Sequence, residues 1–98
     1  MMPTLRLALH TWTLLTTPLA DVLALIPETG WQGVELSRLS FAPNHERALP
    51  AAEVERLVQR SGQPVACVGV EPGWMWADGD ARRRLLDVFD ERCRLAVT

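Results

Sequence analysis

Three short apolar runs alternate along the chain with segments whose apolar residues recur at helical spacing. The runs cover residues 5–9, 33–36 and 65–70. Near-continuous apolar runs of this length are typical of strands buried in a parallel sheet. Alternation of such strands with helices predicts parallel βα units. The pattern therefore predicts an α/β fold.

The first helical segment begins at Pro18, which suits a first turn, with Thr17 as its cap. Pro27 either ends this helix or tightens its last turn, and Gly30 suits the left-handed position just past the end. Apolar residues recur every three or four positions and predict one buried face, made of Leu19, Val22, Leu23 and Ile26.

Two further helices follow the second and third runs. One opens at Pro50 and stops at Gly62, with Val54, Leu57 and Val58 as its buried face. The other is capped by Asp78 or Asp80, and its predicted buried face consists of Leu85, Leu86, Phe89, Cys93, Ala96 and Val97. No stop signal precedes Thr98, so we expect the chain to be the front of a larger α/β protein.

The amino-acid composition narrows the kinds of function that the protein can have. The chain has 98 residues, of which 48% are hydrophobic, and a net charge of −2. This charge gives no global electrostatic reason to expect nucleic-acid binding, and residues 82–84, three arginines, are interpreted as a solvated helix face balanced by nearby acids. No apolar run approaches the roughly 18 residues of a membrane span. Cys67 and Cys93 are predicted to be reduced core thiols, which favours a cytoplasmic protein.

Chemistry-bearing side chains gather where the predicted strands end. The carboxyl ends of parallel strands form the working face of α/β folds. The residues there are His10 and Trp12 after the first strand, Glu35 in the second, and Glu71 and Trp74 after the third. The sequence therefore predicts one binding face that carries a histidine, two carboxylates and tryptophans.

Glu35 is the most constrained of these residues. Its side chain must point opposite to those of Val34 and Leu36, because strand side chains alternate. If the two apolar neighbours pack under helices, Glu35 points into the interior of a βα barrel, where a carboxylate needs a partner, a metal or a substrate hydroxyl. A purely structural salt bridge with Arg38 or Arg6 is the alternative.

The remaining candidates also have structural alternatives. His10 could simply hydrogen-bond a neighbouring carbonyl, and Trp74 could pack in a lid rather than under a sugar ring. No dinucleotide, P-loop, CxxC, HExxH or GxSxG motif occurs, and His10 and His45 lack metal-ligand spacing.

Residues 7–13 (LALHTWT), 30–36 (GWQGVEL) and 68–74 (VGVEPGW) together resemble the start of the xylose isomerase-like TIM barrels, the sugar phosphate isomerases and epimerases grouped with endonuclease IV-like proteins. The resemblance implies that residues 1–98 are a partial barrel domain. They would form the N-terminal three βα units of a (β/α)8 TIM barrel, incomplete in this chain.

The same resemblance implies a function. The complete barrel would act on a small carbohydrate, a sugar or sugar phosphate, by metal-assisted proton transfer. A divalent metal (Mn, Mg or Zn) would be held by later strand ends and by no residue of this chain, which alone is expected to be inactive. The substrate-binding positions that carry over are His10, Trp12, Glu35, Glu71 and Trp74, and the resemblance assigns no catalytic residue.

Two other interpretations remain open. The chain could be a truncated, non-enzymatic half-barrel that needs a partner chain or a second copy, joined through open sheet edges. It could also be an endonuclease IV-like DNA-repair barrel, which would require zinc-binding histidines and a basic groove that the sequence does not show. The leading interpretation involves neither nucleic acid nor membrane as a partner.

Overall fold

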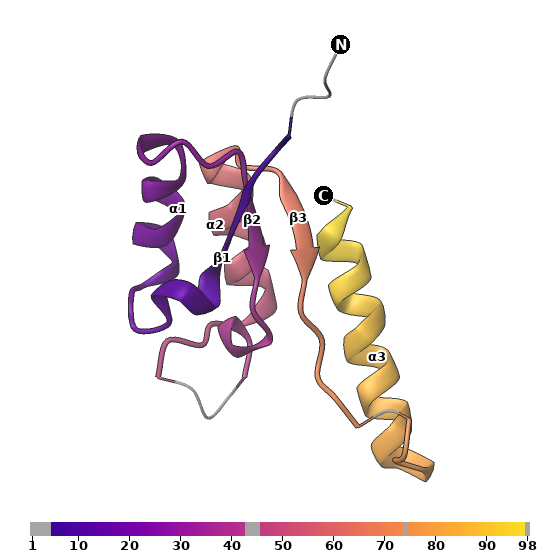
Figure 1. Ribbon diagram of the computed structural model, residues 1–98. Helices are drawn as coiled ribbons and strands as arrows, with labels where there is room; N and C mark the ends of the chain where they lie inside the picture. The colour runs from indigo at the N-terminus through magenta and orange to yellow at the C-terminus, as the bar shows by residue number, and fades with distance from the viewer. Residues whose placement is uncertain (1–4, 43–45, 74, 98) are drawn as a thin grey trace.

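The computed structural model describes residues 5–42, 46–73 and 75–97. A three-stranded, all-parallel sheet in the order β1-β2-β3 forms its centre (Figure 1). The strands are β1 (Ala8–His10), β2 (Gly33–Leu36) and β3 (Val65–Val68). The helices are α1 (Leu19–Glu28), α2 (Ala51–Ser61) and α3 (Gly79–Ala96), with short 3-10 turns η1 (Thr11–Leu14) and η2 (Arg38–Ser40).

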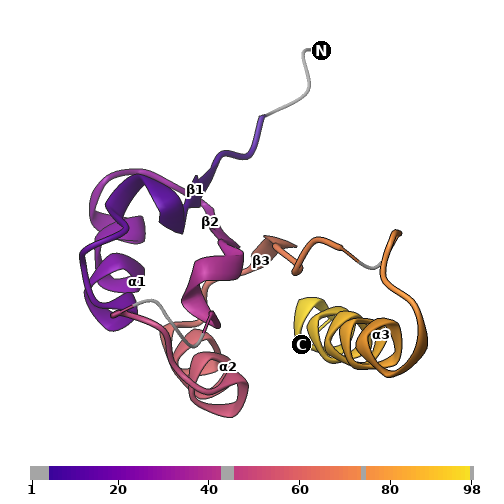
Figure 2. The same ribbon diagram turned by 90° about the horizontal axis from the view of Figure 1, so that it is seen from below.

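Helices α1 and α2 lie together on one face of the sheet and enclose the core (Figure 2). Val34 and Leu36 point from β2 into this core and have no exposed surface. Ile26 of α1 and Val54 of α2 are equally buried. The alternation predicted for β2 is confirmed, since Glu35 between the two apolar residues is partly exposed on the opposite face.

The carboxyl ends of α1 and α2 follow their local sequences, whereas at the start of α1 the cap position is Pro18 rather than the predicted Thr17. Pro27 lies inside the last turn of α1 and does not end the helix, which continues to Glu28. Gly62 ends α2 with φ 71°, a left-handed conformation that glycine adopts without strain. The predicted stop of α2 at Gly62 is confirmed.

The buried face predicted for α3 is largely wrong. The helix runs beside β3, at the edge of the sheet, and contacts the rest of the structure through another side (Figures 1 and 2). Its buried residues are Arg92 and Leu95, and Leu85 and Val88 are half-buried. The predicted residues Leu86, Phe89, Cys93, Ala96 and Val97 are exposed. Spacing alone could not decide between two overlapping apolar stripes on one helix.

The structure also contradicts the predicted burial of the two thiols, because Cys67 and Cys93 are both free and exposed. Cys67 lies in β3, and within the described residues no helix covers the face of the sheet opposite α1 and α2. A strand at the edge of a small sheet is not buried on both faces, although its apolar sequence suggests that it is.

The barrel prediction is wrong. The structure is a small α/β fold with one open, three-stranded parallel sheet and three helices, and α3 lies against the edge of β3. Barrel closure requires strands that tilt and stagger around a full circle. Strand–helix alternation predicts a parallel sheet in either architecture, so the sequence pattern could not distinguish an open sheet from part of a barrel.

Among the described residues, no helix is both long enough and apolar enough to cross a membrane.

Candidate functional site at the carboxyl edge of the sheet

His10 and Glu35 face each other across neighbouring strands. The two residues are partners in the register of β1 and β2. The Nε2 atom of His10 lies 3.7 Å from Oε1 of Glu35, and the side chains are 39% and 40% exposed. Their position at the carboxyl edge, on the face that α1 and α2 leave uncovered, confirms that these two predicted residues meet.

A backbone contact orients the imidazole of His10. The backbone N–H of Trp12 donates a hydrogen bond of 3.0 Å to His10 Nδ1. In a neutral imidazole, Nδ1 must then be the acceptor and Nε2 carries the proton. The Nε2–H group therefore faces the Glu35 carboxylate. The 3.7 Å separation is too long for a direct hydrogen bond and leaves both polar atoms available to a third group.

Cys67 extends this pair into a row across all three strands. Glu35 pairs in register with Cys67, although Val34 pairs with Val65. The register shift inserts one extra residue, Ala66, into β3 at this point. His10, Glu35 and Cys67 thus occupy matching positions on consecutive strands; we call them the strand-end row. Small residues Ala8, Gly33 and Ala66 line a hollow next to the row, towards the amino ends of the strands.

Buried hydroxyl groups hold the loops that follow β1 and β2. The backbone N–H of Ser37 donates a hydrogen bond of 2.8 Å to Thr11 Oγ1, and both residues are buried. Ser37 Oγ in turn accepts from the backbone N–H of Leu39. These contacts connect η1 to η2 beneath the strand ends, so the backbone that carries His10 and Glu35 is fixed from below.

Glu71, the third predicted strand-end residue, pairs with Arg38 rather than with the row. Oε2 of Glu71 lies 3.5 Å from Nη1 of Arg38, and the side chains are 31% and 40% exposed. The close approach of backbone at Gly69 makes this contact possible, since a Cβ there would lie 2.7 Å from the backbone nitrogen of Arg38. Arg38 therefore forms a salt bridge with Glu71, so one of the two predicted alternative partners of Glu35 is paired elsewhere.

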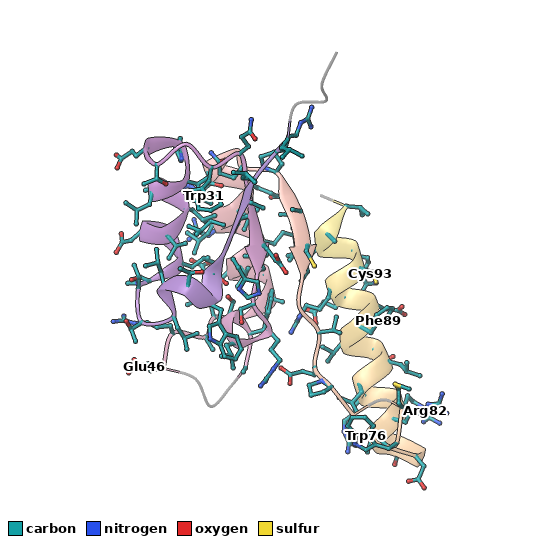
Figure 3. All side chains as sticks on the ribbon, viewed as in Figure 1. Trp31, Glu46, Trp76, Arg82, Phe89 and Cys93 are labelled. Atoms are coloured by element: carbon teal, nitrogen blue, oxygen red, sulfur yellow. The ribbon has the colours of Figure 1, made fainter. Side chains whose placement is uncertain are left out.

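The predicted tryptophans have different outcomes. Trp12 is 53% exposed beside the row, as a platform for a ligand requires. Trp74 lies outside the described residues. Trp76, which the sequence placed in the same loop, is 77% exposed at the start of α3, at the far end of that helix from β3 (Figure 3).

The metal-assisted chemistry implied by the family resemblance has no donor set in the described part of the chain. Residues 5–42, 46–73 and 75–97 bring no three histidine, cysteine, aspartate or glutamate side chains together in a way that could hold a metal ion. His10 and Glu35 supply two donors, which do not fit a resident metal by themselves.

Sequence reasoning missed the position of Cys67 beside Glu35 because it treated the third apolar run as an unbroken strand. The register shift between Val34 and Glu35 brings Cys67, rather than Ala66, opposite Glu35. No local motif signals this bulge.

Comparisons with protein-family models, with curated proteins and with solved structures found no match to this chain. The resemblance to sugar isomerases rests on the three sequence segments that carry it.

Proposed function

We propose that this chain binds a small sugar or sugar phosphate at the strand-end row, and that His10 and Glu35 move protons on it as in sugar isomerases and epimerases. The observation that carries the proposal is the His10–Glu35 pair. A proton-bearing Nε2 and a carboxylate oxygen stand 3.7 Å apart without bonding each other directly. A sugar oxygen about 2.8 Å from each atom would satisfy both groups at once.

The same two groups suit proton transfer next to a carbonyl. The Glu35 carboxylate takes the proton from the carbon beside the carbonyl, and the His10 Nε2–H gives its proton to the carbonyl oxygen. The product of this step is an enediol. Protonated Glu35 then gives its proton to the former carbonyl carbon while His10 Nε2 takes the proton of the hydroxyl on the neighbouring carbon, which gives the isomeric sugar. The epimer forms when a water protonates the original carbon from the opposite face, the resulting hydroxide takes the Glu35 proton, and His10 Nε2 takes back the proton of the carbonyl oxygen.

Two neighbours suit a carbohydrate. Trp12 is an exposed ring next to His10 and can cover the apolar face of a sugar. Arg38 lies three residues beyond Glu35, and its guanidinium can exchange the half-exposed Glu71 carboxylate for a phosphate group. A cytoplasmic location is part of the proposal, because reduced thiols such as Cys67 and Cys93 persist in reducing compartments.

Solvent deuterium tests the proposal directly. The chain is incubated in D2O with a panel of aldoses, ketoses and their phosphates, while amide shifts report binding. We expect shifts centred on β1 and β2 and deuterium at the carbon next to the carbonyl. Glu35→Gln should abolish deuterium incorporation but keep most of the binding, since it retains size and hydrogen bonding.

Glu28→Gln is the matched control, because Glu28 is an exposed carboxylate at the end of α1. It should leave both readings unchanged. Absence of shifts around His10 and Glu35 with every sugar would overturn the binding proposal. Binding with no deuterium incorporation would overturn the proton-transfer step alone.

A further inference from the structure

Helix α3 presents an apolar stripe that nothing in the described structure covers. Leu86 is 40% exposed, Phe89 41% and Val97 86%, and Cys93 is also exposed. Phe89 and Cys93 lie along the side of α3 that faces away from the sheet (Figure 3). An adjoining side of the helix already rests on the sheet edge through Arg92 and Leu95. The stripe is therefore not needed for contacts with β3.

The spacing of the stripe is that of a helix-pairing seam. Its residues Leu86, Phe89 and Cys93 are separated by three and four positions, and the same alternation extends to Arg82 before them and to Ala96 after them. This is the heptad pattern with which two helices interlock their side chains. We infer that two copies of this chain pair through α3, antiparallel and about a two-fold axis, with Leu86 and Phe89 of each copy at the centre.

Charge complementarity selects the antiparallel arrangement. Suppose that Leu86 of one copy faces Phe89 of the other. Arg83 of one copy and Asp90 of the other then lie beside the same gap between two layers of paired side chains. Because of the two-fold axis, this pair occurs twice. A parallel arrangement would instead place the arginines at 82–84 of both copies side by side, and like charges at this distance repel. The helix dipoles also oppose each other favourably in the antiparallel pair.

Arg83 is free to change partners. Its contact with Asp80 in the same helix is a 3.6 Å pair whose side chains are 77% and 82% exposed. Such surface pairs contribute little to stability. Replacing Asp80 by the partner's Asp90 therefore costs little.

The structure exposes 6813 Å², whereas a folded monomer of this mass is expected to expose about 5,600 Å². This excess is spread over the whole molecule, and the exposed apolar residues of α3 contribute part of it. Met75 and Trp76, 74% and 77% exposed before α3 begins, lie at the end of the helix that the partner's Val97 would approach.

Cysteine crosslinking tests the register. Arg82→Cys, made together with Cys67→Ser, places the new thiol in the same layer as Cys93 of the other copy. Within one chain the two positions are about 16 Å apart along the helix, too far for a disulfide. We expect oxidation to give a covalent dimer. Arg84→Cys in the same background points away from the seam and should stay monomeric on a non-reducing gel, as should Cys67→Ser alone.

Sedimentation tests the interface itself. The unmodified chain should sediment as a dimer, and Leu86→Glu as a monomer with unchanged far-ultraviolet circular dichroism. Arg84→Glu, on the same helix but outside the seam, should remain dimeric. Arg83→Asp should weaken the dimer about tenfold, because two pairs are lost, and Arg83→Asp with Asp90→Arg should restore it. A chain that stays monomeric at 100 µM (about 1 mg/mL), or equal crosslinking of Arg82→Cys and Arg84→Cys, would overturn the inference.

Discussion

The guanidinium carbon of Arg92 lies 3.7 Å from the centroid of the Phe41 ring. The contact joins α3 to the segment after η2, and both residues are buried at 8% exposure. Nη1 of Arg92 is 3.1 Å from a carboxylate oxygen of Glu91, but the angles of this contact do not make it a hydrogen bond. The aromatic face of Phe41 is therefore the main partner of a cation that is only partly compensated.

Replacement of this cation should be tolerated better than loss of the ring. Arg92→Met keeps an apolar stem and removes a buried charge, so the free energy of unfolding should change by less than about 1 kcal/mol. Phe41→Ala should lower it by about 3–5 kcal/mol through the cavity it leaves. Urea denaturation measures both, with exposed Arg94→Met as the control. A larger loss for Arg92→Met than for Phe41→Ala would contradict this account.

The hydroxyl of Thr11 should matter more than its size. Thr11→Val keeps the shape of the side chain but leaves the buried N–H of Ser37 without an acceptor. We expect a loss of about 1–3 kcal/mol in the free energy of unfolding. Thr13→Val, on an exposed residue of the same 3-10 turn, should change it little. Equal effects of the two variants would show that the buried bond contributes nothing specific.

A methyl group at position 69 should separate the loops that carry Arg38 and Glu71. Gly69→Ala brings a Cβ within 2.7 Å of one backbone atom and 3.2 Å of another, and backbone cannot move aside as a flexible side chain can. The expected loss of stability is about 1–3 kcal/mol. Ala66→Ser, at an exposed position in β3 shortly before Gly69, is the control and should be nearly neutral. If urea denaturation gives the two variants the same free energy of unfolding, the backbone around position 69 is loosely packed.

Helix α2 offers a test by pH. The side-chain hydrogen bond from Arg56, with a smaller direct charge effect, lowers the pKa of Glu53 below its ordinary value of 4.5. A depressed carboxyl pKa contributes stability above the pKa of the unfolded chain, and the contribution disappears as pH falls through the folded pKa. Arg56→Ala should raise the pKa of Glu53, measured by carbon NMR titration. Arg60→Ala, whose charge has the smaller influence, should raise it less. An unshifted Glu53 in Arg56→Ala would contradict the pairing.

The sequence predicted what depends on local pattern and missed what depends on distant contacts. Alternation around Glu35 placed this carboxylate opposite Val34 and Leu36, and spacing identified the buried face of α1. The open sheet, mistaken for part of a barrel, depends on how α3 packs, and two apolar stripes on that helix were equally consistent with its sequence. The pairing of Glu71 with Arg38 depends on backbone proximity at Gly69, which no residue pattern encodes.

The division of β2 into a buried and an open side has an evolutionary consequence. Val34 and Leu36 are constrained by the helices beneath them, whereas His10, Glu35 and Cys67 project from the same strands without supporting the core. Substitutions in the strand-end row should therefore cost little folding free energy. Under the proposed function, such a surface can acquire new specificities one residue at a time, because each intermediate sequence still folds.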